Sequence, residues 1–492
     1  MNPRLRLVLV AILFPVLAAW TGISLAQEKH FLAVFLAGIS LWGILAWTRG
    51  PLAEAWMLAF LFFGYVIGNR GFAQISLVGQ APILMGEMGL AIGLPLVLLR
   101  GMRSRVLPLH RDWLHFLLLF WIALGTGRIA FDLRAHGFVA VRDFAMIYYV
   151  AYFFVARALI EHDASRRLLH QAVLFTFAVL PGIGALGMSF PDFFQDHFSI
   201  NGVPIIYYKG DLLATFLFTG YVILVPPPSS SAGFRDGWRW LAAAASLVLG
   251  LLLLSRSSLV GLLVAMAWMA WARRWRPFCT FVAVCAVGLM AVTVHSLLQK
   301  QDFSQTKAYA IYEVALSIVD YSGTRAYVSS DSSNKGDNNR FRLVWWRNVL
   351  TETATTSPLL GLGFGADLAR GFVLEYYPTD DAEFTARSPH NIFVTTFGRM
   401  GALGVAVLAA FYWAQARATR RTVRAARRGE MSDDALTYQA AVWVVLISAC
   451  LGVVLEGPMG AIPFWIMLGL AHQATTAAKP EAAAGAETET TA

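Results

Sequence analysis

Long apolar runs separated by short polar or charged segments dominate the sequence. A helix that crosses the hydrocarbon core of a membrane needs about 20 mostly apolar residues, and about fourteen segments approach that length. The expected spans are, roughly, 5–26, 31–48, 52–68, 81–99, 113–127, 140–160, 168–189, 210–225, 238–254, 258–272, 277–298, 389–416, 438–456 and 459–473. The pattern therefore predicts an all-α, polytopic membrane helical bundle of about 12–14 transmembrane helices.

One long polar interruption divides this pattern. The expected parts are N-terminal helices over 1–237, further helices over 238–298, an extracytoplasmic loop over 299–388, C-terminal helices over 389–473 and a disordered cytoplasmic tail over 474–492. Within the loop, the tract 329–339 is too polar to bury anything. We expect a helix from about Arg340 to Thr353, because a helix usually ends at or before the residue that precedes a proline, here Pro358. The glycines between Gly361 and Gly365 then predict a turn.

Composition supports a membrane protein and excludes several other classes. The chain is 57% hydrophobic and 14% charged, whereas soluble domains carry about 25% charged residues. The three cysteines all lie in apolar segments and show neither a disulfide framework nor a metal-ligand spacing. We expect no metal and no cofactor. The net charge of +9 reflects cytoplasmic loops rather than a nucleic-acid partner.

The distribution of lysine and arginine predicts the orientation. With the N-terminus inside, cytoplasmic segments hold 22 of the 39 Lys and Arg residues, and the short outer loops hold seven. Positive residues accumulate on the cytoplasmic side of membrane proteins, so both termini should be cytoplasmic and the long loop outside. The first span follows Arg4 and Arg6 and resembles a cleaved signal peptide or an uncleaved signal anchor. We favour the anchor, because the rest of the chain is also apolar.

Cations on the outer side are the exceptions to this rule. Arg256 lies in a tight outer turn within Leu254–Leu259, where it either contacts outer lipid phosphates or grips a phosphate ligand in bidentate fashion. The outer ends of neighbouring predicted spans carry further cations, which either have structural roles or together form a cationic outer face. These are Arg128, Arg134, Arg142, which is a candidate partner of Asp143, and Lys209.

The twelfth span opens with Ser388, Pro389, His390 and Asn391. This order predicts a serine N-cap, proline at the first helical position and His390 at the second. The positive end of a helix favours neutral imidazole, which accepts protons, and the free N–H groups there bind anions. The alternative is an interfacial histidine that only caps the helix.

The predicted loop helix is both basic and aromatic. Arg340 and Arg347 are seven residues apart and share a face, and Phe341 and Trp345 form an apolar stripe. Such a helix either rests on lipid or binds a polyprenyl phosphate. The Gly361–Gly365 run lacks the Lys-Ser/Thr of a P-loop and is better explained as a turn. Acidic residues near 380–383 are better explained as a solvated loop than as a Ca²⁺ site.

Three stretches in order resemble the bacterial O-antigen ligase and O-antigen polymerase superfamily. They are Leu254 to Gly261, Asn339 through Trp346 to Gly365, and His390 to Gly404, and the resemblance covers roughly 240–410. The resemblance implies a GT-C-like membrane glycosyltransferase of the bacterial inner membrane, with a periplasmic loop over a cavity for an undecaprenyl-diphosphate-linked glycan. One departure is Arg399, which stands where the family often has an acid.

The resemblance also implies roles for particular residues. Arg256 and Arg340 correspond to the family arginines that hold the diphosphate, and His390 to the histidine that aids attack by an acceptor hydroxyl, without a metal. Because diphosphate is a good leaving group, cations that stabilise its charge supply much of the catalysis. The remaining candidate binding residues are Asn391, Arg128, Arg142, Lys209 and Arg347.

The predicted reaction moves a glycan from undecaprenyl diphosphate to an acceptor hydroxyl at the outer face of the membrane. The acceptor is lipid A core for a ligase, a second glycan chain for a polymerase, or a protein serine, and the sequence does not decide among them. The alternative class is a polysaccharide flippase or another multi-helix transporter. A transporter predicts charges deep within the bundle, broken helices and internal repeats, whereas the unusual residues here lie at outer helix ends and on one loop.

Overall fold

The computed structural model describes most of the chain from Gly50 to Thr476. The described ranges are 50–78, 81–104, 112–200, 202–227, 236–299, 302–306, 330–377 and 386–476, with a few single residues elsewhere. The spans expected at 5–26 and 31–48, the acidic residues at 380–383 and the tail beyond Thr476 lie outside these ranges.

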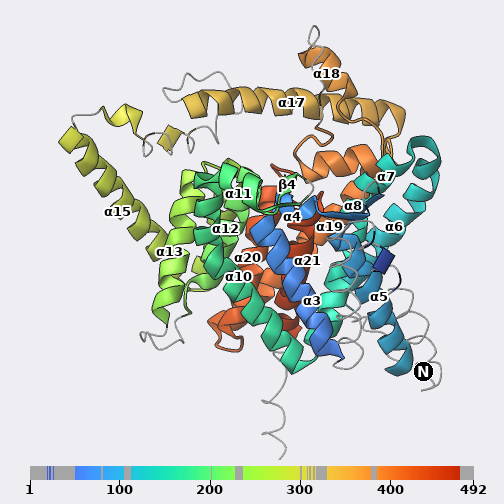
Figure 1. The fold of residues 1–492 in the computed structure, drawn as a ribbon, viewed down its shortest axis with the longest axis horizontal. Coiled ribbons are helices and arrows are strands. Elements are labelled where there is room, and N and C mark those ends of the chain that lie inside the picture. The colour runs from blue at the N-terminus through green and yellow to red at the C-terminus, as the bar shows by residue number, and fades with distance from the viewer. Residues whose placement is uncertain are drawn as a thin grey trace, which may run out of the picture.

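Helices make up nearly all of the described structure (Figure 1). In chain order they are α3 (Pro51–Phe63), the π-helix η1 (Gly64–Gly68), α4 (Arg70–Ala73), α5 (Met85–Ser104), α6 (Trp113–His136), α7 (Phe138–Asp143), α8 (Ala145–Tyr148), α9 (Ala151–Ile160), α10 (Asp163–Ser189), α11 (Pro191–His197), α12 (Gly210–Leu224), α13 (Gly237–Leu252), α14 (Arg256–Trp271), α15 (Arg276–Gln299), the 3₁₀ turn η3 (Phe303–Gln305), α17 (Ser330–Thr356), α18 (Arg370–Tyr376), α19 (Ile392–Arg427), α20 (Asp433–Ala449) and α21 (Pro458–Thr476). Two short antiparallel pairs join β1 (Ser76–Val78) to β2 (Ala81–Leu84) and β3 (Ser199–Ile200) to β4 (Val203–Pro204).

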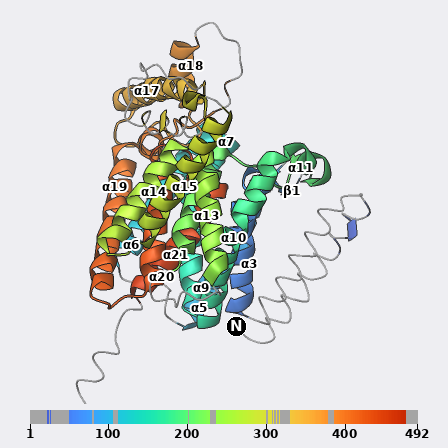
Figure 2. The same cartoon turned by 90° about the vertical axis from the view of Figure 1, so that its left-hand side faces the viewer.

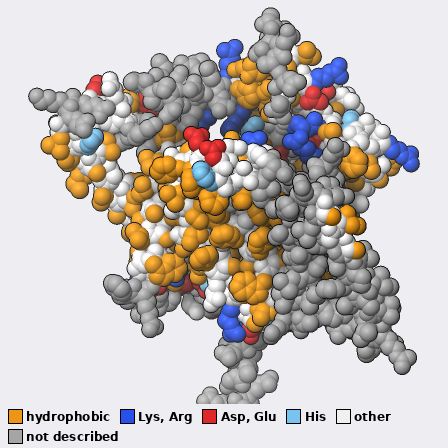
Figure 3. Space-filling model, viewed as in Figure 1, with side chains coloured by type: hydrophobic (Ala, Val, Ile, Leu, Met, Phe, Trp, Pro, Cys, Tyr) orange, Lys and Arg blue, Asp and Glu red, His pale blue; other side chains and the backbone are white. Residues whose placement is uncertain are grey.

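Six of the described helical segments are long and apolar enough to cross a membrane. They are Pro51–Gly68, Trp113–His136, Phe138–Ile160, Asp163–Ser189, Arg276–Leu298 and Ile392–Arg427. Shorter apolar helices, such as α12 and α14, lie among them. Hydrophobic side chains cover the sides of the bundle, and most of the visible charged side chains gather at the end beside α17 (Figure 3). These features confirm the predicted all-α, polytopic membrane fold.

The centre of the bundle consists of α9, α12, α20 and α21, which are buried along most of their length. Helix α14 packs directly on α20 at Gly261. A Cβ atom at Gly261 would lie 2.5 Å from the carbonyl oxygen of Val444, so only glycine allows the two backbones to approach this closely. By contrast, α15 leans away from the bundle and leaves most of its side chains exposed (Figures 1 and 2).

The long loop forms a cap on one end of the bundle. Helix α17 lies across that end, nearly at right angles to the bundle helices, with α18 above it (Figures 1 and 2). Its small core contains Trp345, Val349, Leu368 and Phe372, all essentially inaccessible to solvent. The cap is therefore a packed unit that rests on the bundle through α17 and α19.

Two local predictions were wrong. Helix α17 begins at Ser330, within the tract that was expected to precede it. Helix α19 begins at Ile392 with Asn391 as its N-cap, three residues later than predicted, because the Asn391 side chain accepts hydrogen bonds from the backbone N–H groups of Phe393 and Val394. The span expected at 140–160 is confirmed within Phe138–Ile160, and short steps near Phe144 and Tyr149 divide it into α7, α8 and α9.

Candidate functional site

A pocket of about 1030 Å³ opens beside the cap, at the end of the bundle where α17 lies. Its wall combines α4, the α7–α8 region, the segment 386–390, the start of α19 and the turn between α20 and α21. Of the residues singled out from the sequence, His390, Lys209 and Arg142 line it, together with Arg399. Arg70, Arg387 and Glu456 also line it, and their positions were not predicted. The lining thus carries five basic residues against three acidic ones, Glu87, Asp143 and Glu456, so its net charge is positive.

The cap holds His390 in place. The Trp346 Nε1–H donates a 2.6 Å hydrogen bond to the carbonyl oxygen of Pro389, and the ring of Trp345 meets the His390 ring edge to face at 5.9 Å. Trp345 is itself fixed by a 2.7 Å hydrogen bond from its Nε1–H to the Leu368 carbonyl oxygen. The aromatic residues that were predicted to form a stripe on lipid thus pack against the segment that carries the histidine.

His390 has an unusual backbone and a neutral ring. Its φ of 59° is left-handed, a conformation that costs a non-glycine residue about 1–2 kcal/mol. Burial, together with the positive charges of Lys209 and Arg342, lowers the pKa of His390 to about 4. Its Nδ1 is buried and has no hydrogen-bond partner among the described residues. At neutral pH the imidazole is therefore able to accept a proton.

Lys209 connects His390 to two carboxylates. Its Nζ lies 3.6 Å from Oδ2 of Asp211 in the first turn of α12, and its charge acts on both His390 and Glu456. Glu456 accepts a 3.0 Å hydrogen bond from Thr395 Oγ1. Burial raises the pKa of Glu456 above its ordinary value, although hydrogen bonds from Ser388 and Thr395 act in the opposite direction. The wall of the pocket thus offers a proton acceptor, an ammonium group and a buried carboxyl group with a raised pKa.

Hydrogen bonds connect the start of α14, where Arg256 lies, to the start of α12. Arg256 is the first residue of α14, and Ser255 and Ser258 on either side of it join hydroxyls at 2.9 Å. Ser258 also contacts Thr215 Oγ1 at 2.8 Å and the backbone carbonyl oxygen of Asp211 at 3.2 Å. The serines of this motif therefore tie the start of α14 to the start of α12, where Lys209 and Asp211 lie. Arg256 is half-buried and is not among the residues that line the pocket.

On α17, the arginine that faces the site is Arg342. Arg340 is exposed, whereas Arg342 is half-buried, is attracted by Asp211 and lowers the pKa of His390. Helical spacing explains the difference, because Arg342 is three residues before the buried Trp345 and so shares its face. This spacing is the sequence signal that could have identified Arg342. Arg347 is exposed and forms an ion pair with Glu375.

The glycine run is a turn that joins the cap to α6 and α19. Gly361, Gly363 and Gly365 all have positive φ, from 74° to 101°, which glycine adopts at no steric cost. Asp132 of α6 accepts a 2.7 Å hydrogen bond from the Phe364 N–H. Arg128 pairs with Asp132 at 3.0 Å and donates to the Gly361 carbonyl oxygen. The structure thus gives Arg128 a role in anchoring this turn, away from the pocket lining.

Arg399 holds the opposite side of the turn. Its guanidinium pairs with Asp143 at 2.8 Å and donates to the carbonyl oxygens of Gly363 and Ala366. Asp143 also pairs with Arg387 at 3.2 Å and accepts from the Gly365 N–H at 3.0 Å. The partners of Asp143 are therefore Arg387 and Arg399, and the suggested pairing with Arg142 is not seen. Arg142 instead lines the pocket.

Comparison with known proteins adds one finding. Residues 241–409 match the family model described as O-antigen ligase, in the same segment where the sequence resemblance lies. No curated protein matches the chain. The matched segment runs from α13 into α19 and contains Arg256, Arg342 and His390, whereas the pocket wall from α4, α7 and α8 comes from the unmatched N-terminal part.

Proposed function

Because the chain carries a domain of the O-antigen ligase family, we propose that it is an inner-membrane glycosyltransferase that moves a glycan from undecaprenyl diphosphate to an acceptor hydroxyl. The observation that carries the proposal is the pocket beside the cap that His390 and Lys209 line, with Arg342 of α17 close enough to lower the pKa of His390. The acceptor is the lipid A core or the growing end of a second glycan chain.

The proposed chemistry is a single displacement at the anomeric carbon of the donor. The acceptor hydroxyl passes its proton to His390, its oxygen bonds to the anomeric carbon, and the bond from that carbon to the diphosphate oxygen breaks. Lys209, Arg342 and Arg256 stabilise the negative charge that develops on the departing diphosphate. In this mechanism the cationic side chains do what a divalent ion does in many transferases, so the reaction proceeds without a metal.

The orientation proposed from the charge distribution fits this site. Helix α19 begins beside His390 and carries six arginines from Arg417 to Arg428 around its other end. Positive residues favour the cytoplasmic side, so the pocket would face the periplasm and the polyprenyl tail would lie in the membrane beside the bundle. A lipid-linked donor would then reach the pocket without leaving the membrane.

Reconstitution with a labelled undecaprenyl-diphosphate oligosaccharide tests the proposal. We expect labelled product with lipid A core or with a second lipid-linked glycan, and the productive acceptor separates a ligase from a polymerase. Movement of the intact lipid-linked donor between leaflets, without any transfer, would support a flippase instead.

The low pKa of His390 predicts the pH dependence of the reaction. Because the folded pKa of about 4 lies below the ordinary value of about 6.5, His390 stays neutral as the pH falls from 7.5 to 5. We expect kcat/KM to stay nearly constant over that range. When the donor is bound, its negative diphosphate favours the imidazolium form and raises the pKa of His390. The fall of kcat toward acidic pH should therefore occur at a higher pH than the fall of kcat/KM. A halving of kcat/KM near pH 6.5 would contradict this assignment.

The two neighbouring arginines of α17 make a matched pair. Arg342→Gln should weaken donor use by about 10–100-fold, because a charge-assisted hydrogen bond contributes about 1.5–3 kcal/mol. Arg340→Gln, at an exposed position on the same helix, should have a smaller effect. The measurement is the KM for the labelled donor. A larger loss in Arg340→Gln would return the role to Arg340, as the sequence resemblance implies.

A further inference from the structure

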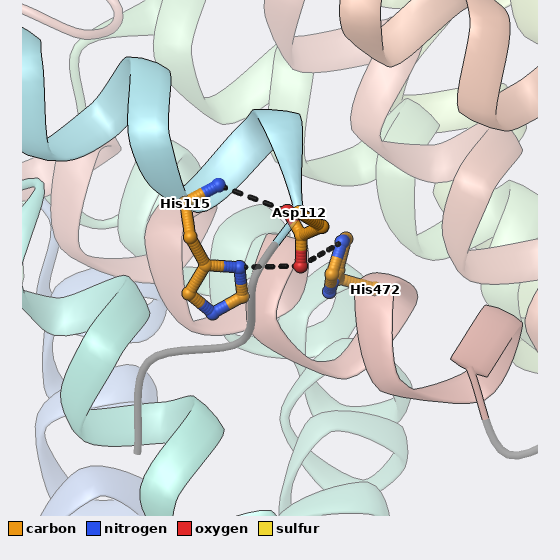
Figure 4. Close-up of side chains that lie close together, drawn as sticks. All are labelled: Asp112, His115 and His472. Atoms are coloured by element: carbon orange, nitrogen blue, oxygen red, sulfur yellow. Dashed lines mark hydrogen bonds and ion pairs between the residues drawn. The ribbon is translucent and has the colours of Figure 1, made fainter. Parts of the chain in front are cut away.

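A cluster of two histidines and an aspartate lies at the end of the bundle opposite to the pocket. Asp112 precedes α6, His115 is in its first turn, and His472 is near the end of α21 (Figure 4). Helix α6 is 24 residues long, which corresponds to about 36 Å, and the residues that follow it line the pocket. The cluster therefore lies far from the proposed transferase site and has no role in that chemistry.

The three side chains converge on one carboxylate oxygen. Oδ2 of Asp112 lies 2.7 Å from Nδ1 of His115 and 3.6 Å from Nε2 of His472. One donor atom from each residue can be chosen so that all three lie within 4.8 Å of one another. Around a tetrahedral ion with bonds of about 2.1 Å, donor atoms are separated by about 3.3–3.5 Å. Shifts on the order of 1 Å would therefore complete such a site.

Packing holds both imidazoles in position. His115 is 1% exposed and His472 is 8% exposed, and their rings meet at 5.3 Å. Phe153 of α9 packs edge to face against both rings, at 5.0 Å and 5.9 Å. The Asp112 side chain keeps 33% of its surface accessible, so an ion from bulk water can reach the cluster through it. Buried nitrogen donors that are fixed by their surroundings are typical of metal sites.

From this geometry we propose that Asp112, His115 and His472 bind a divalent transition-metal ion of the zinc type, with water as the fourth ligand. Two imidazole nitrogens and one carboxylate oxygen suit Zn²⁺, whereas Mg²⁺ and Ca²⁺ prefer oxygen alone. The buried Arg157 on α9, which is attracted to Asp112, adds positive charge nearby. That charge opposes the binding of any cation, so the ion would have to be held by its bonds to the two imidazoles and the carboxylate.

The bound ion would link the start of α6 to the end of α21. Helix α6 carries Asp132, which anchors the glycine turn of the cap, and α21 begins at Pro458, which lines the pocket. A metal link at the ends far from the pocket would stabilise both helices, whose opposite ends position the candidate site. No sequence pattern indicated this site, because an Asp-x-x-His pair and a histidine 357 positions further on do not form a recognisable ligand spacing.

The test uses the full-length protein in lipid nanodiscs after treatment with a chelator. We expect it to bind one Zn²⁺ per chain, to raise its unfolding temperature with Zn²⁺, and to give the absorption of tetrahedral Co²⁺ when Co²⁺ is added instead. His472→Ala should lose this binding. His170→Ala is the matched control, because His170 is also partly buried but hydrogen-bonds to Tyr438 at 2.9 Å; it should bind like the wild type.

Asp112→Asn separates a metal site from a helix cap. Asp112 also accepts a 3.0 Å hydrogen bond from the His115 N–H as the N-cap of α6, and asparagine caps a helix equally well. If the cluster binds metal, Asp112→Asn should bind Zn²⁺ about tenfold more weakly or worse while keeping its fold. Zn²⁺ affinity equal to that of the wild type in Asp112→Asn, or no Zn²⁺ bound by the wild type, would overturn the proposal.

Discussion

Replacing His390 by asparagine should lower the rate of glycan transfer by about 10²–10⁴-fold, the usual contribution of a positioned general base. Asparagine is the informative replacement because it tolerates positive φ better than most residues, and His390 has a φ of 59°. The variant therefore removes the imidazole while leaving the backbone between Pro389 and Asn391 unstrained. Binding of the donor should change less than the rate, since Lys209 and Arg342 remain.

The measurement is single-turnover transfer from the labelled donor. His197→Asn is the control, because His197 is exposed on α11 and lies outside the pocket; it should transfer at the rate of the wild type. A rate for His390→Asn within a few-fold of the wild type would remove His390 from the mechanism, even if Lys209 and Arg342 still proved necessary.

Arg399→Ala should destabilise the protein by about 3–5 kcal/mol. Removing one partner of a buried ion pair leaves the other charge without its main compensation, and Arg399 is 2% exposed. The change leaves Asp143 with Arg387 as its remaining ion-pair partner, and it also removes donors from the carbonyl oxygens of Gly363 and Ala366. Because these groups hold the glycine turn, we expect the cap to loosen before the bundle unfolds.

Thermal unfolding in detergent measures this effect, and protease sensitivity of the cap reports the local part. Arg424→Ala, at an exposed position on the same helix, is the control and should change little. The double variant with Asp143→Ala should cost less than the sum of the two single changes, since the residues are in contact. If each single change costs less than about 1 kcal/mol and the two costs add in the double variant, the ion pair contributes little to stability.

This ion pair also accounts for Arg399, the position at which the chain departs from the pattern of the family that it resembles. The resemblance leads one to expect an acid at position 399, and the structure places Asp143 from α7 opposite Arg399 instead. An ion pair thus joins α7 to α19, with the acid on α7 and the arginine on α19. Asp143 lies outside the matched segment 241–409, so the family pattern alone could not reveal this compensation.

Hydropathy predicted the helices well, because burial in lipid depends on local composition. Each span expected between 52 and 473 has a helix over most of its length, and α12 and α13 match within two residues at each end. The start of α17 could not be predicted in this way. Propensity argues against a helix at 330–339, and the cooperative extension of the docked helix outweighs it.

The site was harder to predict than the fold because it depends on contacts between distant segments. His390, Lys209 and Arg142 were found from their type and position and do share one pocket. Glu456 and Arg387 line the same pocket, and neither was among the predicted site residues. Their place in the pocket follows from the packing of the cap on α7 and α21, which no local pattern encodes.

The most direct test of the central claim is an experimental structure of the protein in nanodiscs with undecaprenyl diphosphate bound. The account predicts the diphosphate in the pocket beneath α17, within hydrogen-bonding distance of Lys209 and Arg342, with His390 facing the oxygen that carries the sugar in the donor. A diphosphate bound elsewhere on the protein, with this pocket filled only by water, would contradict it.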